Sequence, residues 1–310
     1  MSPGADDATR PFQPDAGPLF LVGPARSGTS LLYKVLCLHP DAAYIPNWVA
    51  RMPSAPWLAA LDRVPRWMPI TQRRVWFGSD AANAYVYGRT RSFAERLFPM
   101  PVEGEPLFAR SGVPPTGPPD DPERAGRSIR TALRRIRRAS GGEVLINKRI
   151  ANLYRIPFLA ATFPAGRFVA LVRDGRAVAL SLSKVDWWLD HRVVSQGVTP
   201  REWEAEGGDP WELCARNWVG ELSAMDGGLV DVEEERILRL RYEDLIADPA
   251  EMLRTIARFA GLPPSSAWDG RVGALSFPDR NEAWQRALDP EARRTIDRVG
   301  ASALAGHGYG

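Results

Sequence analysis

The sequence is poor in the residues that build metal centres and disulfide scaffolds. Its 310 residues include only two cysteines and three histidines, and these form no Cys/His cluster. Such a composition argues against a zinc centre. Cys37 and Cys214 each lie in an apolar periodic segment, so we expect reduced core thiols. The sequence predicts no metal site.

Long apolar runs and strong net charge are also lacking. No stretch approaches the roughly 20 apolar residues of a transmembrane helix, and the polar start of the chain has no signal-peptide core. We therefore expect no membrane association and a cytoplasmic location. The net charge of +3 is mild. It gives no argument for nucleic acid, although it is compatible with an anionic substrate.

The length favours one large α/β domain, or one domain with a lid, over two independent domains. Residues 1–17 are polar and contain proline, which predicts a disordered leader. Residues 18–310 are expected to form a single domain, with an insertion or lid rich in Pro and Trp around residues 46–125. Within it, residues 99–124 predict an exposed loop, either a lid connection or a passive linker.

A loop with two glycines follows the first apolar run. Residues 19–22 predict a buried strand, and a helix is expected over residues 29–38. Gly23 and Gly28 permit tight turns, and the N–H groups at the helix start favour an anion such as phosphate or sulfate. The spacing nearly matches the P-loop of nucleotide triphosphatases, but Thr29 stands where that motif has lysine. An ordinary strand–turn–helix is the alternative interpretation.

A second strand–loop–helix segment has the same arrangement. Residues 168–172 predict a strand that ends in Arg173-Asp174-Gly175-Arg176, and a helix is expected over residues 177–182. Arg173 and Arg176 should emerge at the carboxyl edge of the sheet, where doubly wound sheets bind ligands. Ser181 lies eight residues beyond Arg173 and can share its anion only if the chain curls there. The alternative is a strand-edge Arg–Asp pair.

The remaining periodicity completes an α/β pattern. Further strands are expected at residues 42–45, 144–147 and 237–240, with helices at residues 127–140, 156–163, 202–225, 243–259 and 290–304 and short helices near 57–61 and 81–87. This alternation predicts a P-loop-like, three-layer fold with a parallel sheet of about five strands between helices. The Arg cluster of residues 127–138 could bind anions, but a solvated helix face is the favoured interpretation.

With both anion loops in view, the sequence resembles the sulfotransferases that use 3′-phosphoadenosine 5′-phosphosulfate (PAPS). The likeness is greatest to the bacterial and tyrosylprotein sulfotransferase-like branch. The matching stretches, in family order, are residues 23–32 with His39-Pro40-Asp41, Asn147-Lys148, residues 155–159 with Phe163-Pro164, residues 173–181, residues 241–245 with Asp248-Pro249, and Trp284-Gln285-Arg286. Each is moderately specific, and together they span nearly the whole chain after residue 18.

The resemblance implies roles for individual residues. It implies a 5′-phosphosulfate site built from Arg26, Ser27, Gly28, Thr29 and Ser30. It implies a 3′-phosphate site at Arg173 and Ser181, with Tyr242 near the adenine and ribose. Lys148 matches a lysine that reaches the phosphosulfate, so Arg26 and Lys148 are expected to neutralise the leaving phosphate. The product would be 3′,5′-phosphoadenosine (PAP), and no metal would be required.

One departure concerns the general base. Related tyrosylprotein enzymes carry a Glu shortly after His-Pro-Asp, whereas here residues 42–47 include no carboxylate and end in Asn47. Either the base comes from elsewhere, with Asp186, Asp190 and His191 as candidates, or the acceptor needs little help. The acceptor is expected to be a small molecule or peptide carrying a hydroxyl or amine. It would bind in an apolar pocket shaped by the Trp-rich segments of residues 47–76 and 187–218. A P-loop kinase-like phosphotransferase and a non-catalytic nucleotide-binding protein remain alternatives, and the oligomeric state stays open.

Overall fold

A five-stranded parallel sheet forms the centre of the chain as far as the structure describes it. The structure, a computed structural model, describes residues 17–78, 92–277 and 279–310. The strands are β1 (Leu19–Val22), β2 (Ala42–Ala43), β3 (Val144–Lys148), β4 (Arg167–Val172) and β5 (Ile237–Arg241). They lie in the order β2-β3-β1-β4-β5, and every neighbouring pair is parallel. The predicted fold class is confirmed.

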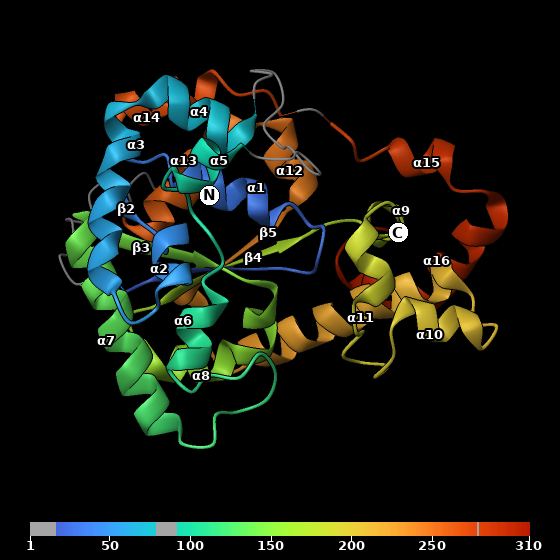
Figure 1. Ribbon diagram of the computed structural model, residues 1–310. Helices are drawn as coiled ribbons and strands as arrows, with labels where there is room; N and C mark the ends of the chain where they lie inside the picture. The colour runs from blue at the N-terminus through green and yellow to red at the C-terminus, as the bar shows by residue number, and fades with distance from the viewer. Residues whose placement is uncertain (1–16, 79–91, 278) are drawn as a thin grey trace, which may run out of the picture.

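The sheet separates two hydrophobic cores, because successive side chains of each strand point to opposite faces. Phe20 and Phe168 belong to one core, while Leu21 and Val169 belong to the other. Buried strands of this kind are apolar on both faces, as expected for a parallel sheet covered by helices. The result is the three-layer arrangement visible in Figure 1.

Different helices cover the two faces. The core that contains Phe20 is completed by α2 (Asn47–Arg51), η1 (Pro56–Asp62), α6 (Glu105–Arg110), α7 (Pro122–Ser140), η2 (Ile150–Arg155), α8 (Ile156–Thr162), α9 (Gly175–Leu182), η3 (Asp186–Asp190), α11 (Pro210–Leu229), α15 (Ala283–Ala287) and α16 (Pro290–Gly306). The core that contains Leu21 is completed by α1 (Thr29–Leu36), α4 (Pro69–Phe77), α12 (Tyr242–Ala247), α13 (Pro249–Ala260) and α14 (Ser266–Gly273). The remaining helices are α3 (Arg63–Trp67), α5 (Phe93–Leu97), α10 (Pro200–Ala205) and η4 (Glu234–Arg236).

Two predicted helices are each divided in two. The helix expected over residues 202–225 breaks into α10 and α11 at Gly207-Gly208, and Asp209 caps the new helix through the N–H of Trp211. The helix expected over residues 243–259 breaks into α12 and α13 at Asp248-Pro249. Proline disfavours a helical conformation at the residue before it, which explains the second break.

The prediction of an exposed loop at residues 99–124 is wrong in part. This stretch contains α6, and Met100, Leu107, Phe108 and Val113 are buried in the core. The strand predicted at residues 42–45 is present but shorter, as Ala42–Ala43, and the short helix predicted near residues 57–61 is present as η1. The short helix predicted near residues 81–87 falls outside the described residues. The leader likewise lies outside them, except residue 17.

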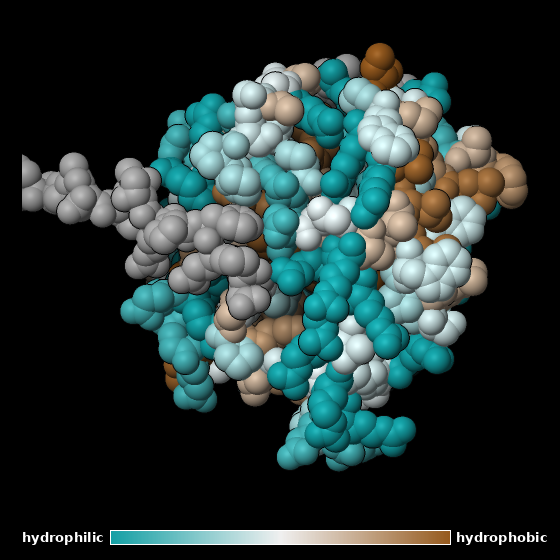
Figure 2. Space-filling view, turned by 90° about the vertical axis from the view of Figure 1, so that its left-hand side faces the viewer, coloured by the Kyte–Doolittle hydropathy of each residue, from teal (hydrophilic) through white to brown (hydrophobic). Residues whose placement is uncertain are grey.

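The arginines of α7 lie mainly on its outer face. Arg127, Arg130, Arg134, Arg135 and Arg138 are exposed, while Ile129, Leu133 and Ile136 are buried on the other side. Hydrophilic residues run down the middle of the molecular face in Figure 2, which views the side where α7 lies. None of the described helices is both long enough and apolar enough to cross a bilayer.

The order of the strands determines where a ligand-binding crevice lies. The chain runs from β1 to one edge of the sheet, returns through β3, and then passes β1 to reach β4 and β5. The connections that leave β1 and β4 therefore diverge, and the crevice outside the carboxyl ends of two such strands is where open α/β sheets bind ligands. The two predicted anion loops follow these two strands.

Candidate active site

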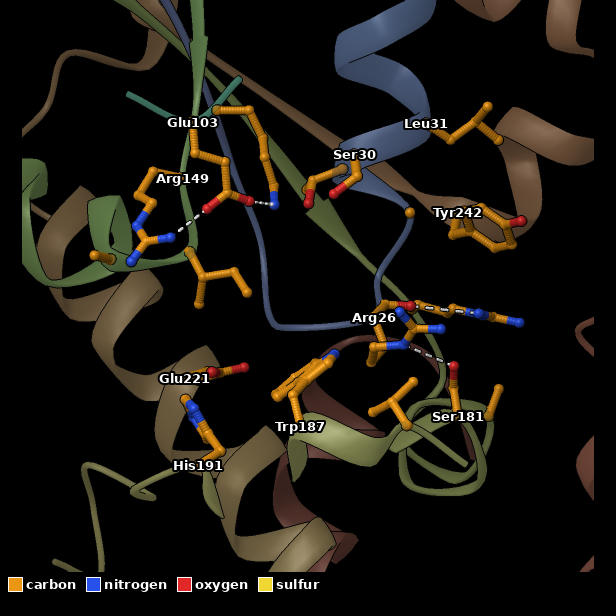
Figure 3. A pocket seen from close by; sticks show the side chains of 18 of the residues that line it. Arg26, Ser30, Leu31, Glu103, Arg149, Ser181, Trp187, His191, Glu221 and Tyr242 are labelled. Atoms are coloured by element: carbon orange, nitrogen blue, oxygen red, sulfur yellow. Dashed lines mark hydrogen bonds and ion pairs between the residues drawn. The ribbon is translucent and has the colours of Figure 1, made fainter. Parts of the chain in front are cut away.

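A cavity of about 750 Å³ lies at the carboxyl ends of β1, β3 and β4. Its lining brings together most of the residues that the sequence predicts: Arg26, Gly28, Thr29, Ser30, Lys148, Arg173, Ser181 and Tyr242. These residues come from four separate parts of the chain, so their convergence depends on the parallel sheet. Figure 3 shows Tyr242 and Ser181 at one end of the cavity and Arg149, Glu221 and His191 at the other.

The loop after β1 is built around close backbone approaches. Gly28 has φ +90°, and a Cβ at this position would lie 2.5 Å from the Tyr242 ring. A Cβ on Gly23 would lie 2.3 Å from the carbonyl oxygen of Leu171. Arg26 has φ +68°, a left-handed conformation that is uncommon for a residue with a side chain. Such backbone conformations occur where the surrounding structure holds them, often at functional sites.

Contacts from three directions hold Arg26. Its Nε donates to the Ser181 hydroxyl at 2.9 Å, and its carbonyl oxygen accepts from Arg173 at 3.3 Å. The preceding N–H, that of Ala25, donates to a carboxylate oxygen of Glu221 at 2.6 Å. Figure 3 shows Arg26 beside Ser181, which lies on α9. The loop is therefore fixed from α9, α11 and the end of β4.

Ser27 differs from the other loop residues. Its side chain is buried, its hydroxyl has no hydrogen-bond partner among the residues that the structure describes, and it does not belong to the cavity lining. Thr29 and Ser30 do line the cavity, at the start of α1. The N–H groups of a first helical turn have no partner within the helix and favour anions. A contact of Ser27 with an anion would thus involve its backbone rather than its hydroxyl.

Arg173 lies at the end of β4 and meets neutral groups. Its guanidinium donates to the carbonyl oxygens of Arg26 and Arg280 and to the Asn281 side chain at 3.2–3.3 Å. It also lies over the Tyr242 ring, 4.5 Å from the centroid. Arg280 itself lines the cavity, although the sequence analysis did not single it out.

Arg176 does not share this site. Its guanidinium pairs with Asp174 at 2.8 Å and lies over the Trp284 ring, 4.4 Å from the centroid. Asp174 also caps α9 by accepting from the N–H of Arg176. The expected strand-edge Arg–Asp pair therefore exists, and it involves Arg176 while Arg173 enters the cavity.

Lys148 ends β3 beside the loop and is bound by a carboxylate. Its ammonium lies 2.5 Å from Glu103, and the guanidinium of Arg149 lies 2.5 Å from the other oxygen of the same carboxylate. Burial raises the pKa of Glu103, but the charges of Lys148 and Arg149 outweigh burial and hold it below its ordinary value. Glu103 is therefore ionised at neutral pH, and Figure 3 shows its carboxylate in contact with Arg149.

The sequence analysis missed Glu103 because it lies in the segment predicted as an exposed loop. Asn47 holds that segment in place: its side-chain amide donates to the carbonyl oxygens of Arg96 and Phe98 at 3.1 and 3.0 Å and accepts from the N–H of Met100 at 3.3 Å. The residue found in place of the family Glu is thus a buried anchor.

The three candidate bases, Asp186, Asp190 and His191, occupy different places in the structure. His191 lines the cavity, whereas Asp186 and Asp190 do not, and Asp190 pairs with Arg201 at 3.1 Å. The His191 ring stacks on Trp188, with centroids 5.7 Å apart. Burial and the nearby guanidinium of Arg149 lower the pKa of His191 from 6.5. Its imidazole is therefore mainly neutral at pH 7 and able to accept a proton.

Glu221 is a second titratable group that the sequence analysis missed. It is buried on α11 and lines the cavity. Burial raises the pKa of Glu221 to about 7, against the opposing influence of the Ala25 N–H, the Asn217 amide and the Lys148 ammonium. A glutamate in an amphipathic helix usually faces solvent, so its sequence context gave no signal.

The family model described as "Sulfotransferase family" matches residues 18–266. The chain belongs to this family. It is 25% identical to the omega-hydroxy-beta-dihydromenaquinone-9 sulfotransferase Stf3 of Mycobacterium bovis over 79% of this chain and 63% of that protein. It is 26% identical to a protein-tyrosine sulfotransferase of Drosophila melanogaster over 40% of this chain and 22% of that protein.

These alignments cover only part of the relatives, less than two thirds of the length of each. Among solved structures, sulfotransferase STF9 from Mycobacterium avium is similar, with a TM-score of 0.56 and 16% identity. That likeness covers 96% of this chain and 77% of STF9 and supports the fold of this sulfotransferase family member.

Proposed function

We propose that this protein transfers a sulfuryl group from PAPS to the hydroxyl of an acceptor. The observation that carries the proposal is the meeting of two anion-binding elements in one cavity. The loop of residues 23–30 and the Arg173–Ser181 pair approach from the ends of adjacent strands. PAPS carries two separate anionic groups, the 5′-phosphosulfate and the 3′-phosphate. A ligand with a single anionic group would not need the second element.

The donor's orientation follows from these elements. The 5′-phosphosulfate would lie at the start of α1, with Arg26 and the N–H groups of residues 28–30, where the helix dipole favours negative charge. The 3′-phosphate would meet Arg173 and Ser181, and the adenine and ribose would lie near Tyr242. Arg280, whose carbonyl oxygen accepts from Arg173, also lines the cavity and adds positive charge.

Catalysis would be largely electrostatic. Sulfuryl transfer resembles phosphoryl transfer, in which positioning and charge stabilisation supply most of the acceleration. We assign Lys148 to the oxygen that loses its bond to sulfur, because that oxygen gains negative charge in the transition state. An ammonium has three donors, so Lys148 can bind this oxygen without leaving Glu103.

We assign the acceptor proton to His191. The His191 imidazole is mainly neutral at pH 7 and lines the same cavity. Its ring packs against the rings of Trp187 and Trp188, and these contacts fix its plane. Glu103 is less suited because two cations hold its pKa low. A hydroxyl acceptor is favoured because the names of both relatives specify one, a tyrosine and an omega-hydroxy compound.

Calorimetry of nucleotide binding tests the donor assignment. PAP should bind much more tightly than ATP, and EDTA should not weaken it, because the loop has Thr29 where a P-loop has its lysine. Tight ATP binding that requires Mg²⁺ would instead support a kinase-like phosphotransferase. PAP binding without sulfuryl transfer to any hydroxyl compound would support a non-catalytic nucleotide-binding protein.

A further inference from the structure

The end of the cavity away from Tyr242 is mainly apolar. The side chains that line it include Pro115, Ile150, Ala151, Tyr154, Val185, Trp187 and Val194. These residues belong to the segment after α6, to η2 and to the stretch that follows α9. Binding sites usually join such an apolar lining to a few polar groups that fix orientation. Here the polar groups are Lys148, Arg149, Glu103, His191 and Glu221.

The two cations named at this end, Lys148 and Arg149, already have charged partners. Glu103 binds both Lys148 and Arg149, and Arg149 also donates to Glu105 at 3.1 Å. An acidic acceptor would have to compete with these carboxylates for the same cations. Lys184 follows the end of α9, is exposed, and lines the cavity beside Val185. The paired cations near the reacting groups therefore favour an uncharged acceptor.

The rim of the cavity extends this apolar surface. Within residues 186–194, Trp188 and Val193 are buried and anchor the segment. Trp187, Leu189 and Val194 remain 43%, 40% and 46% exposed, and Trp187 and Val194 also line the cavity. Figure 3 shows Trp187 between His191 and Arg26. Exposed apolar side chains gathered at the mouth of a site indicate an apolar ligand.

We propose that the acceptor is an uncharged apolar alcohol or phenol whose carbon skeleton packs against Trp187 and Val194. Its hydroxyl lies between Lys148 and His191. This inference rests on the proposed function. In the reaction, the acceptor oxygen bonds to sulfur while the bond from sulfur to the phosphate oxygen breaks. The hydroxyl proton passes to His191, and PAP leaves with the electron pair of the broken bond.

Equilibrium binding tests the acceptor class without requiring turnover. Calorimetry on the PAP-bound protein would compare phenol, 4-butylphenol and 4-octylphenol with a tyrosine peptide flanked by glutamates. Affinity should rise about three- to fourfold for each methylene that becomes buried. We expect at least a tenfold gain from butyl to octyl, and weaker binding of the peptide than of 4-octylphenol.

Two tryptophan variants make the test specific. Trp187→Ala should reduce the gain from butyl to octyl to less than threefold while leaving PAP affinity unchanged. Trp67→Ala is the matched control, because Trp67 is 81% exposed on α3 and does not line the cavity. It should retain the wild-type dependence on chain length.

Several results would overturn the inference. These are affinity that does not change with chain length, tighter binding of the acidic peptide, equal losses in both tryptophan variants, or no binding of any phenol to the PAP complex. In each of these the donor assignment stands, because PAP is bound. Failure of PAP itself to bind would overturn the proposed function and this inference together.

Discussion

The two ends of the cavity hold their cations in different ways. At the donor end, Arg173 donates to three neutral oxygens, so an incoming phosphate exchanges weak partners for a charged one. At the other end, Lys148 and Arg149 share the carboxylate of Glu103. The first arrangement favours tight binding of an anion. The second arrangement holds the buried ammonium of Lys148 in place but already satisfies its charge, so it binds a further anion only weakly. This suits a cation that is needed mainly in the transition state.

The largest effect should come from removing the cation at the second end. Lys148→Ala should lower turnover by about a hundredfold or more, as for loss of one oxyanion donor. PAP affinity should fall much less, because the charge on the leaving oxygen is greatest in the transition state. Single-turnover kinetics and calorimetry would measure the two effects separately. A variant with normal turnover would remove Lys148 from the mechanism.

Arg173→Ala addresses the donor end. PAP binding should weaken by roughly 2–4 kcal/mol, the range for a lost charge-assisted contact to a buried anion. Binding of adenosine 5′-phosphosulfate, which lacks the 3′-phosphate, should change little and serves as the control. Equal losses for the two ligands would show that Arg173 acts through the loop, whose Arg26 carbonyl it contacts.

Glu221 lies at the same end of the cavity as His191 and should make stability depend on pH. Because its pKa is about 7 in the folded protein and ordinarily 4.5, the folded state retains its proton over this interval while the unfolded state loses it. Its contribution to the free energy of unfolding should therefore be unaffected below pH 4.5 and fall by up to roughly 3 kcal/mol as pH rises to about 7.

Glu221→Gln isolates this effect. The amide oxygen can still accept from the Ala25 N–H, but the side chain cannot ionise. Denaturant unfolding at pH 5 and pH 8 should show that the variant gains stability relative to wild type at the higher pH. The same difference between variant and wild type at both pH values would contradict the prediction.

Much of the donor end could be predicted because its signals are local. A buried strand, a glycine turn and a helix start occur within about a dozen residues at residues 19–30, and the same pattern recurs at residues 168–177, around Arg173. Parallel topology then brings the two loops together. Lys148 was singled out by the family resemblance, and it ends the strand β3 that the sequence predicts.

The other end depends on contacts between distant residues. Glu103 reaches Lys148 across 45 positions, and its segment has no regular periodicity. Glu221 reaches Ala25 across 196 positions from a helix whose pattern predicts only packing. The break between α10 and α11 was missed because the apolar residues on both sides of Gly207-Gly208 were assigned to one helix.

The smallest expected effect concerns Asn47, which anchors the segment before Glu103. Asn47→Ala should lower the free energy of unfolding by about 1–3 kcal/mol, because it removes an amide that contacts three backbone groups. Arg51→Ala is the matched control. Arg51 donates to the same Arg96 carbonyl oxygen, but it is exposed, so we expect a change within about 0.5 kcal/mol.

Asn47→Asp distinguishes an anchor from a position that needs a base. A carboxylate can accept from the Met100 N–H but cannot donate to the carbonyl oxygens of Arg96 and Phe98, and it would lie close to both. We therefore expect this variant to be less stable than Asn47→Ala, with no gain in turnover. Denaturant unfolding and steady-state rates would measure both quantities. A faster Asn47→Asp enzyme would mean that a proton acceptor at this position still serves the reaction, and the assignment of the acceptor proton to His191 would then be wrong.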